Sequence, residues 1–156
     1  MDSPLRILVA EDEMGDVLLL KSAFEKAGVN PPIYFASDGE EVMKYLQGLP
    51  PFENPINYPL PNLVLLDLKL PRMDGFEVLE WLRNQPRLKH ILVVVLTGSD
   101  LPEDVARAYS LGANAYLVKP AEPDQLVEIV GRLQSYWRSI NSGRSETAHV
   151  HLMATR

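Results

Sequence analysis

The sequence predicts one α/β domain, built on a doubly wound sheet of five parallel strands with helices on both faces. Short apolar runs alternate five times with segments whose apolar residues recur at helical spacing. The runs are continuously apolar, which is typical of parallel strands that are buried on both faces. A chain of 156 residues with 46% hydrophobic and 23% charged residues matches a single globular domain.

The first part of the chain supplies two strand–helix units. The apolar run in Arg6–Asp12 predicts the first strand, and helical spacing predicts a helix over Asp16–Gly28 that ends in a glycine suited to a C-cap. A second strand follows at Ile33–Ser37. Asp38 is the expected N-cap of the next helix, Gly39–Gly48.

A proline-rich segment separates the second unit from the third. Five prolines in Leu49–Pro61 exclude a helix or a central strand, so this segment is predicted to be a long loop. The third strand is Leu63–Asp67, an apolar run that ends in a carboxylate, and a helix follows over about Gly75–Asn84. Because an unpaired buried carboxylate is strongly destabilising, Asp67 calls for a functional explanation.

The last two units complete the alternation. Ile91–Thr97 is rich in β-branched residues and predicts the fourth strand. Asp100 is expected to start the next helix, with Pro102 near the first helical position, and the helix to end at Leu111–Gly112. Ala115–Lys119 is the fifth strand, and Pro123–Ser139 is the last helix. Its expected core stripe is Leu126, Ile129, Val130, Leu133 and Trp137. The domain is predicted to span residues 1–140, and residues 141–156 to be a flexible tail without an output domain.

Composition excludes several classes of function. The chain has no cysteine, which rules out disulfides, thiol catalysis and zinc–thiolate sites. A net charge of −6 argues against a nucleic-acid partner, which would need a basic face. No apolar run is long enough for a membrane span or a signal peptide, so a cytoplasmic protein without membrane contact is expected.

Chemically active side chains follow four of the five predicted strands. Because parallel strands end at one edge of the sheet, these side chains are expected to converge there: Glu11, Asp12, Glu13, Asp67, Thr97 and Lys119. Converging carboxylates repel one another unless a cation lies among them, and oxygen ligands without a thiol suit Mg²⁺. A carboxylate nucleophile, a metal, a lysine and a hydroxyl are the groups needed to accept a phosphoryl group. Each residue alone would be interpreted as a cap or a loop residue; the interpretation depends on their combination.

Four segments together resemble the receiver domains of two-component response regulators, which have a flavodoxin-like (βα)5 fold. The similarity covers about Leu5 to Arg138, and its motifs are "ILVAED", "LVLLDLKLPRMDGFEVL", "VVVLTGS" and "GANAYLVKP". The resemblance implies that Asp67 is the phosphoacceptor, with Lys119 paired to the phosphoryl group. It also implies that Thr97 and Tyr116 are the switch residues and that Pro120 follows a cis peptide. Receiver proteins are not enzymes acting on other substrates; they catalyse only their own phosphorylation and dephosphorylation.

The same resemblance implies a Mg²⁺ site. Asp12, Asp67 and the backbone carbonyl of Lys69 would bind the ion directly, and Glu11 would bind it through water. Glu13 occupies a variable position and is the weaker candidate. The side chains of Lys69 and Ser99 occupy two further variable positions near the phosphoryl group, where they would influence dephosphorylation.

A narrower resemblance implies the partners. "VAEDEMGDVLLL", the long loop and the lack of an output domain resemble the single-domain regulators of bacterial and cyanobacterial phytochrome histidine kinases. Such a kinase would dock on the first helix near Lys21, Ser22 and Glu25. The output would be a phosphotransfer protein, an effector, or a homodimer through the fourth helix, fifth strand and fifth helix.

Other classes of protein remain open at this point. The main alternative is a receiver-like interaction module that works without phosphorylation. An aspartyl phosphatase of the haloacid-dehalogenase type would carry its nucleophile on the first strand, where this chain has "AEDE". A flavodoxin-like FMN binder would need a neutral phosphate loop at the same place, where Glu11, Asp12 and Glu13 would repel the phosphate.

Overall fold

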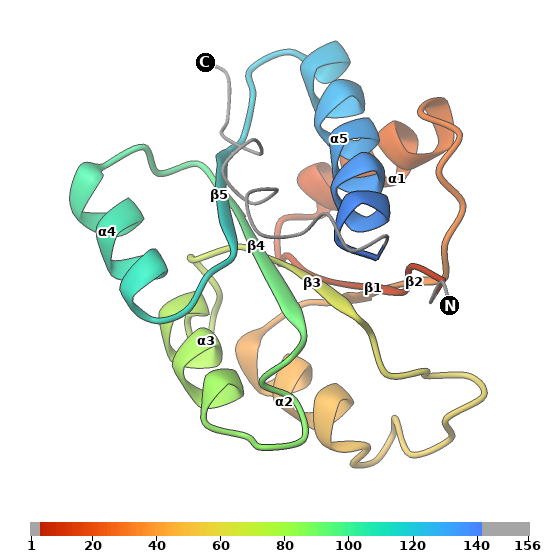
Figure 1. Cartoon of the computed structure of the whole chain (residues 1–156), viewed down its shortest axis with the longest axis vertical. Helices are drawn as coiled ribbons and strands as arrows, with labels where there is room; N and C mark the ends of the chain where they lie inside the picture. The colour runs from red at the N-terminus through yellow and green to blue at the C-terminus, as the bar shows by residue number, and fades with distance from the viewer. Residues whose placement is uncertain (1–3, 142–156) are drawn as a thin grey trace.

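A computed structural model describes residues 4–141, and it contains a five-stranded parallel sheet with helices on both faces (Figure 1). The strands lie in the order β2-β1-β3-β4-β5, and every neighbouring pair is parallel. Their bounds are β1 Ile7–Ala10, β2 Ile33–Ala36, β3 Leu63–Leu66, β4 Leu92–Thr97 and β5 Ala115–Val118. The predicted doubly wound α/β fold is confirmed.

Five helices cover the two faces of the sheet. They are α1 Met14–Lys26, α2 Gly39–Gln47, α3 Gly75–Arg83, α4 Pro102–Ser110 and α5 Pro123–Asn141. Helices α1 and α5 cover one face, and α2, α3 and α4 lie on the other (Figure 1). Two separate apolar clusters fill the layers between helices and sheet, so the strands β1, β3 and β4 are buried on both sides. This double burial explains their continuous apolar runs.

Strand register brings the ends of the central strands level. Ala10 of β1 pairs with Leu66 of β3, and the backbone N–H of Asp67 donates to the carbonyl of Ala10 over 3.1 Å. The next residues, Glu11 and Asp67, therefore leave the sheet side by side. The strand order reverses direction between β1 and β3, and such a switch point is where doubly wound sheets bind their ligands.

Helix ends agree with the sequence in some places and differ in others. Asp38 caps α2 as predicted, because its side chain accepts a 2.7 Å hydrogen bond from the backbone N–H of Glu41. Helix α4 begins at Pro102, as predicted, but its N-cap is Leu101 and not Asp100. Proline fits this first turn because it has no N–H to leave unpaired.

Helix α5 presents a different aromatic residue to the core from the one predicted. Tyr136 is buried in the cluster under α1 and α5, whereas Trp137 is only half-buried. The four aliphatic residues of the predicted stripe are buried as expected. The sequence pattern leaves the two aromatic neighbours nearly equivalent, and packing against the sheet selects Tyr136. The residues of the predicted tail beyond 141 lie outside the described part of the chain.

The proline-rich segment between α2 and β3 is anchored by aromatic packing. The rings of Tyr34, Tyr45, Phe52 and Tyr58 form a cluster with centroid separations of 5.0–6.0 Å. The hydroxyl of Tyr45 donates to the carbonyl of Pro59 over 2.8 Å. The predicted loop is therefore present and held at the end of the sheet opposite to Glu11 and Asp67.

The predicted cis peptide before Pro120 is wrong. Among residues 4–141 the cis peptide bond lies between Pro50 and Pro51. An X–Pro bond prefers the trans form by about 0.5–1 kcal/mol, and Lys119 reaches its partners without a cis bond after it.

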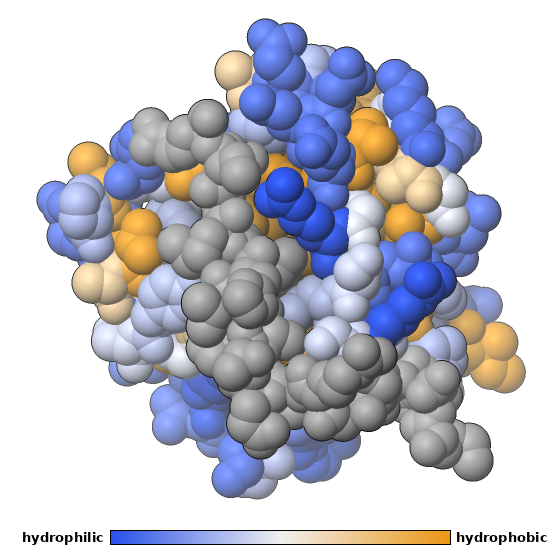
Figure 2. Space-filling view, turned by 45° about the horizontal axis from the view of Figure 1, so that its top comes forward, coloured by the Kyte–Doolittle hydropathy of each residue, from blue (hydrophilic) through white to orange (hydrophobic). Residues whose placement is uncertain are grey.

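The surface drawn in Figure 2 is mainly hydrophilic, with separate apolar areas between the charged side chains. No helix within the described residues is both long enough and apolar enough to cross a membrane.

Candidate functional site

Three carboxylates meet beyond the ends of β1 and β3. Oxygens of Glu11, Asp12 and Asp67 all lie within 4.8 Å of one another. Glu11 and Asp67 are buried and Asp12 is exposed, so the group opens to solvent on one side. The predicted convergence of these three residues is what the structure shows, and their oxygens form a donor set that suits a hard divalent cation.

Lys119 lies directly after β5 and joins this group. Its Nζ lies 2.7 Å from Glu11 Oε1, 2.8 Å from Asp67 Oδ2 and 2.8 Å from Asp16 Oδ2. The backbone N–H of Lys119 donates to the carbonyl of Thr97, which fixes the lysine at the edge of the sheet. One ammonium thus serves three carboxylates, and negative charge remains in excess at the site.

The burial and the excess negative charge together shift the pKa values of the buried groups. Burial raises the pKa of Glu11 from 4.5 to about 7, and the charge of Asp67 adds to the rise. The hydrogen bond from Lys119 opposes this rise but does not cancel the larger effect of burial. Burial lowers the pKa of Lys119, but hydrogen bonds to Asp16, Asp67 and Glu11 outweigh burial and raise it above its usual value. A divalent cation would relieve the repulsion that remains.

Thr97 ends β4 with its hydroxyl buried and unpartnered. The side chain is 0% exposed, and its Oγ1 has no hydrogen-bond partner. Tyr116 on the neighbouring strand β5 is buried in the cluster under α2, α3 and α4, and its hydroxyl donates to the carbonyl of Ser99 over 2.9 Å. The structure therefore holds the tyrosine in its inward position and leaves a donor free at Thr97.

The loop after β3 shapes the rest of the site. The backbone N–H of Lys69 donates to Asp67 Oδ1 over 3.1 Å, which places the Lys69 peptide beside the carboxylate. Gly75 starts α3 so close to the strand that an added Cβ would lie 2.3 Å from the carbonyl oxygen of Asp67. The side chain of Ser99 is tied to α4 by a 2.5 Å hydrogen bond to Asp104.

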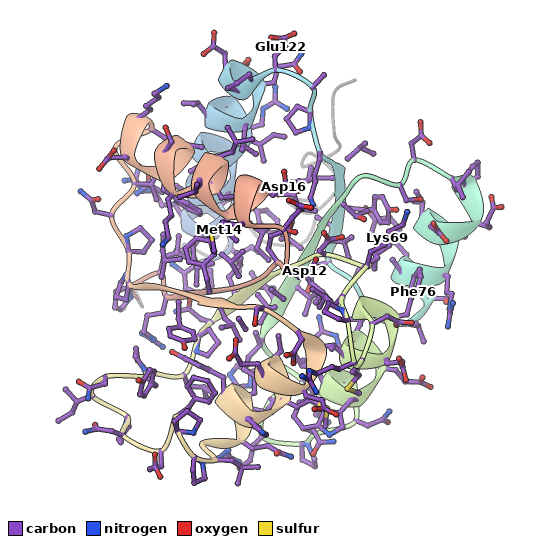
Figure 3. All side chains as sticks on the ribbon, turned by 180° about the vertical axis from the view of Figure 1, so that it is seen from behind. Asp12, Met14, Asp16, Lys69, Phe76 and Glu122 are labelled. Carbon is purple, nitrogen blue, oxygen red and sulfur yellow. The ribbon has the colours of Figure 1, made fainter. Side chains whose placement is uncertain are left out.

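Asp16 is the functional candidate that sequence reasoning missed. It lies in the first turn of α1, and its carboxylate contacts Lys119. Figure 3 shows Asp16 and Asp12 between the start of α1 and the loop after β3 that carries Lys69. The available signal was an acidic residue in the helical turn that follows the acidic end of the first strand. An acidic residue in the first turn also interacts favourably with the helix dipole, so the pattern alone suggested that Asp16 only stabilises the helix.

Comparison with known proteins identifies the family of this fold and site. The model of the response regulator receiver domain matches residues 7–131, and the chain belongs to this family. Receiver domains are signalling modules of two-component systems that interact with sensor histidine kinases and bind a divalent metal. The resemblance predicted from the four sequence motifs is confirmed.

Three relatives illustrate the range of the similarity. Response regulator Rcp1 from Synechocystis sp. is 38% identical over 134 residues, 86% of this chain and 89% of Rcp1. The crystal structure of its Mn²⁺-bound form has a TM-score of 0.76 and covers 86% of this chain and 94% of that one. The phosphorylated cyanobacterial phytochrome response regulator RcpA is 36% identical, with a TM-score of 0.79 over 88% of this chain and 96% of that one. A probable methanogenesis regulatory protein, FilR2 of Methanothrix harundinacea, is 38% identical over 140 residues, 90% of this chain and 88% of FilR2.

Proposed function

We propose that this chain is a response regulator whose Asp67 accepts a phosphoryl group from a sensor histidine kinase. The observation that carries the proposal is the surrounding of Asp67: a buried carboxylate that touches a lysine, with acidic groups on one side. An unpartnered buried hydroxyl ends the neighbouring strand. These are the groups that phosphoryl transfer requires.

In the proposed reaction an oxygen of Asp67 attacks the phosphorus of a phosphohistidine. The P–N bond breaks, an acyl phosphate forms, and the leaving imidazole takes up a proton. Lys119 neutralises charge on the phosphoryl oxygens, and the hydroxyl of Thr97 donates to one of them. The chain thereby acts as a phosphoacceptor and not as an enzyme for other substrates.

The residues present fit a divalent cation. Glu11, Asp12 and Asp67 have oxygens within 4.8 Å of one another. The Lys119 ammonium beside them is shared by Glu11, Asp67 and Asp16, so the site has an excess of negative charge. We assign Mg²⁺ to Asp12, Asp67 and the carbonyl of Lys69, with Glu11 acting through water. When bound, the ion would neutralise charge that develops on the transferred group.

We propose that Thr97 and Tyr116 transmit the change. A phosphoryl oxygen would draw the free hydroxyl of Thr97 toward Asp67, and the inward Tyr116 would stabilise the altered β4–α4 loop through its bond to the Ser99 carbonyl. This would shift the population of conformations of the α4–β5–α5 face. A homodimer on that face, with exposed Leu101 at its margin, is the proposed output, alongside a downstream phosphotransfer or effector protein.

The kinase is proposed to be a phytochrome because Rcp1 and RcpA are similar over most of both chains, and RcpA is by name a phytochrome response regulator. FilR2 shows the same level of identity, so the partner has to be tested directly. Phosphotransfer from a purified autophosphorylated phytochrome kinase should be faster than from an unrelated histidine kinase. Equal rates from both would remove the phytochrome assignment and leave the receiver chemistry intact.

The first test is acid-labile phosphorylation by acetyl phosphate with Mg²⁺. Wild type and Asp124→Asn, which changes an exposed aspartate at the start of α5, should incorporate label equally. Asp67→Asn and omission of Mg²⁺ should abolish incorporation. Equal incorporation in Asp67→Asn, or none in wild type, would instead favour an interaction module that works without phosphorylation. Sedimentation with and without beryllofluoride then tests the dimer, and a monomer under both conditions would refute it.

A further inference from the structure

All three N–H donors of the Lys119 ammonium are engaged by carboxylates. The acceptors are Glu11 Oε1 at 2.7 Å, Asp67 Oδ2 at 2.8 Å and Asp16 Oδ2 at 2.8 Å. An ammonium has three donors and no acceptor, so these three bonds fill its capacity. Lys119 can therefore bind a new oxygen only by releasing one of the carboxylates it now holds.

The three carboxylates differ in how easily they can be released. The side chains of Glu11 and Asp67 are 3% and 7% exposed, so either would become an unpaired buried charge. The side chain of Asp16 is 34% exposed. Asp16 is therefore the partner that water can replace at the smallest penalty.

We propose that Asp16 is a positioning residue that competes with the phosphoryl group for Lys119. In the resting protein Asp16 holds one donor of the ammonium. When Asp67 is phosphorylated, Lys119 exchanges Asp16 for a phosphoryl oxygen while it keeps its contacts with the buried acids. Asp16 thereby weakens the binding of the phosphoryl group, and it sets how readily the site is loaded. This inference rests on the proposed function and deepens it.

The consequence is opposite to that of a residue that assists the reaction. Asp16→Asn removes the competing charge and keeps the shape of the side chain. The pair is partly exposed, so its removal should tighten the binding of a phosphoryl mimic by about two- to fivefold. If Asp16 only stabilised the first turn of α1, Asp16→Asn would lower the stability of the protein and leave its affinity for the phosphoryl mimic unchanged.

The experiment is a calorimetric titration of the metal-loaded protein with beryllofluoride in the presence of Mg²⁺. The control is Glu13→Gln, which removes the same charge from the same acidic segment at a residue with no ion pair to Lys119 among the described contacts. We expect tighter binding for Asp16→Asn than for Glu13→Gln, and a return toward wild-type affinity in Asp16→Glu. Thermal unfolding of each variant separates a change in affinity from a change in stability.

The outcomes distinguish this inference from the proposed function. Equal or weaker affinity in Asp16→Asn, with wild type binding and Asp67→Asn not binding, overturns the competition and leaves the phosphoacceptor role standing. An equal gain in affinity for beryllofluoride in Asp16→Asn and Glu13→Gln also overturns the competition, because the gain would then come from the lower negative charge near the site and not from the contact with Lys119. If wild type binds no beryllofluoride, both the inference and the proposed function fail.

Discussion

Replacing Thr97 by valine should make the resting protein more stable. The hydroxyl of Thr97 is fully buried and has no partner, and an unsatisfied buried hydroxyl is destabilising by about 1–3 kcal/mol. Valine has nearly the same shape and places a methyl group there. Thr97→Val should therefore raise the free energy of unfolding by about 1–2 kcal/mol. For a domain of this size, this corresponds to a rise in Tm of about 2–8 °C.

The assay is urea unfolding in EDTA, with Thr97→Ser as the matched control. Serine keeps the unpaired hydroxyl and loses the methyl group, so it should be less stable than wild type by about 1 kcal/mol. Valine and serine should thus move stability in opposite directions. If Thr97→Val is less stable than wild type, the hydroxyl has a favourable partner in the resting protein, and the reasoning is refuted.

The same substitution should separate phosphorylation from its output. Thr97→Val retains Asp67 and Lys119, so it should still incorporate phosphoryl from acetyl phosphate, at a reduced rate because one hydrogen-bond donor is lost. Hydrogen exchange in the loop between β4 and α4 should then no longer respond to beryllofluoride. A response equal to that of wild type would show that Thr97 does not couple Asp67 to α4.

Three further predictions concern the acidic group, a half-buried arginine and the glycines. In metal-free buffer, the stability that Glu11 contributes is complete below pH 4.5 and is lost as the pH rises to about 7. In urea titrations, the free energy of unfolding of wild type relative to Glu11→Gln should therefore fall by up to about 3 kcal/mol over that range. A difference that does not change with pH would contradict the raised pKa. Arg83→Ala should lower the free energy of unfolding by about 2–4 kcal/mol, because the guanidinium of Arg83 donates to three backbone carbonyls and to Asn114. The control Arg87→Ala, at an exposed residue, should change it by less than about 0.5 kcal/mol. Gly75→Ala should lower the free energy of unfolding by about 1–3 kcal/mol, because the added Cβ would overlap the backbone of Asp67 and Leu68 just after β3. Gly131→Ala on α5, where an added Cβ meets nothing within 4 Å, should raise it by up to about 1 kcal/mol in the same measurement.

Sequence periodicity was enough to predict the fold and the edge at which the site lies. The continuous apolar runs before Glu11 and Asp67 marked the two central strands, and parallel pairing then required their ends to meet. The choice of Tyr136 over Trp137 for the core was not predictable, because both lie near the same stripe and only packing separates them.

The contact between Asp16 and Lys119 joins residues 103 positions apart. No local pattern encodes such a contact. It depends on the distance between the first turn of α1 and the end of β5, and therefore on how both elements pack against the same sheet. Residue types and local spacing therefore could not predict this contact, because tertiary packing determines the distance between the two side chains.

The distribution of buried polar residues explains why stability and function should oppose each other at this site. Among residues 4–141 the buried polar or charged residues are Glu11, Asp67 and Thr97, and all three lie at the carboxyl edge of the sheet. The two core clusters consist of hydrophobic residues. The fold thus places its unfavourably buried polar groups together at the site. A cation would offset the charge of the buried carboxylates, and a phosphoryl oxygen would accept a hydrogen bond from the unpaired hydroxyl of Thr97. A substitution that removes an unpaired buried group, such as Thr97→Val, should stabilise the resting protein. It should also reduce the conformational response to phosphorylation, because the same hydroxyl would bind the phosphoryl group.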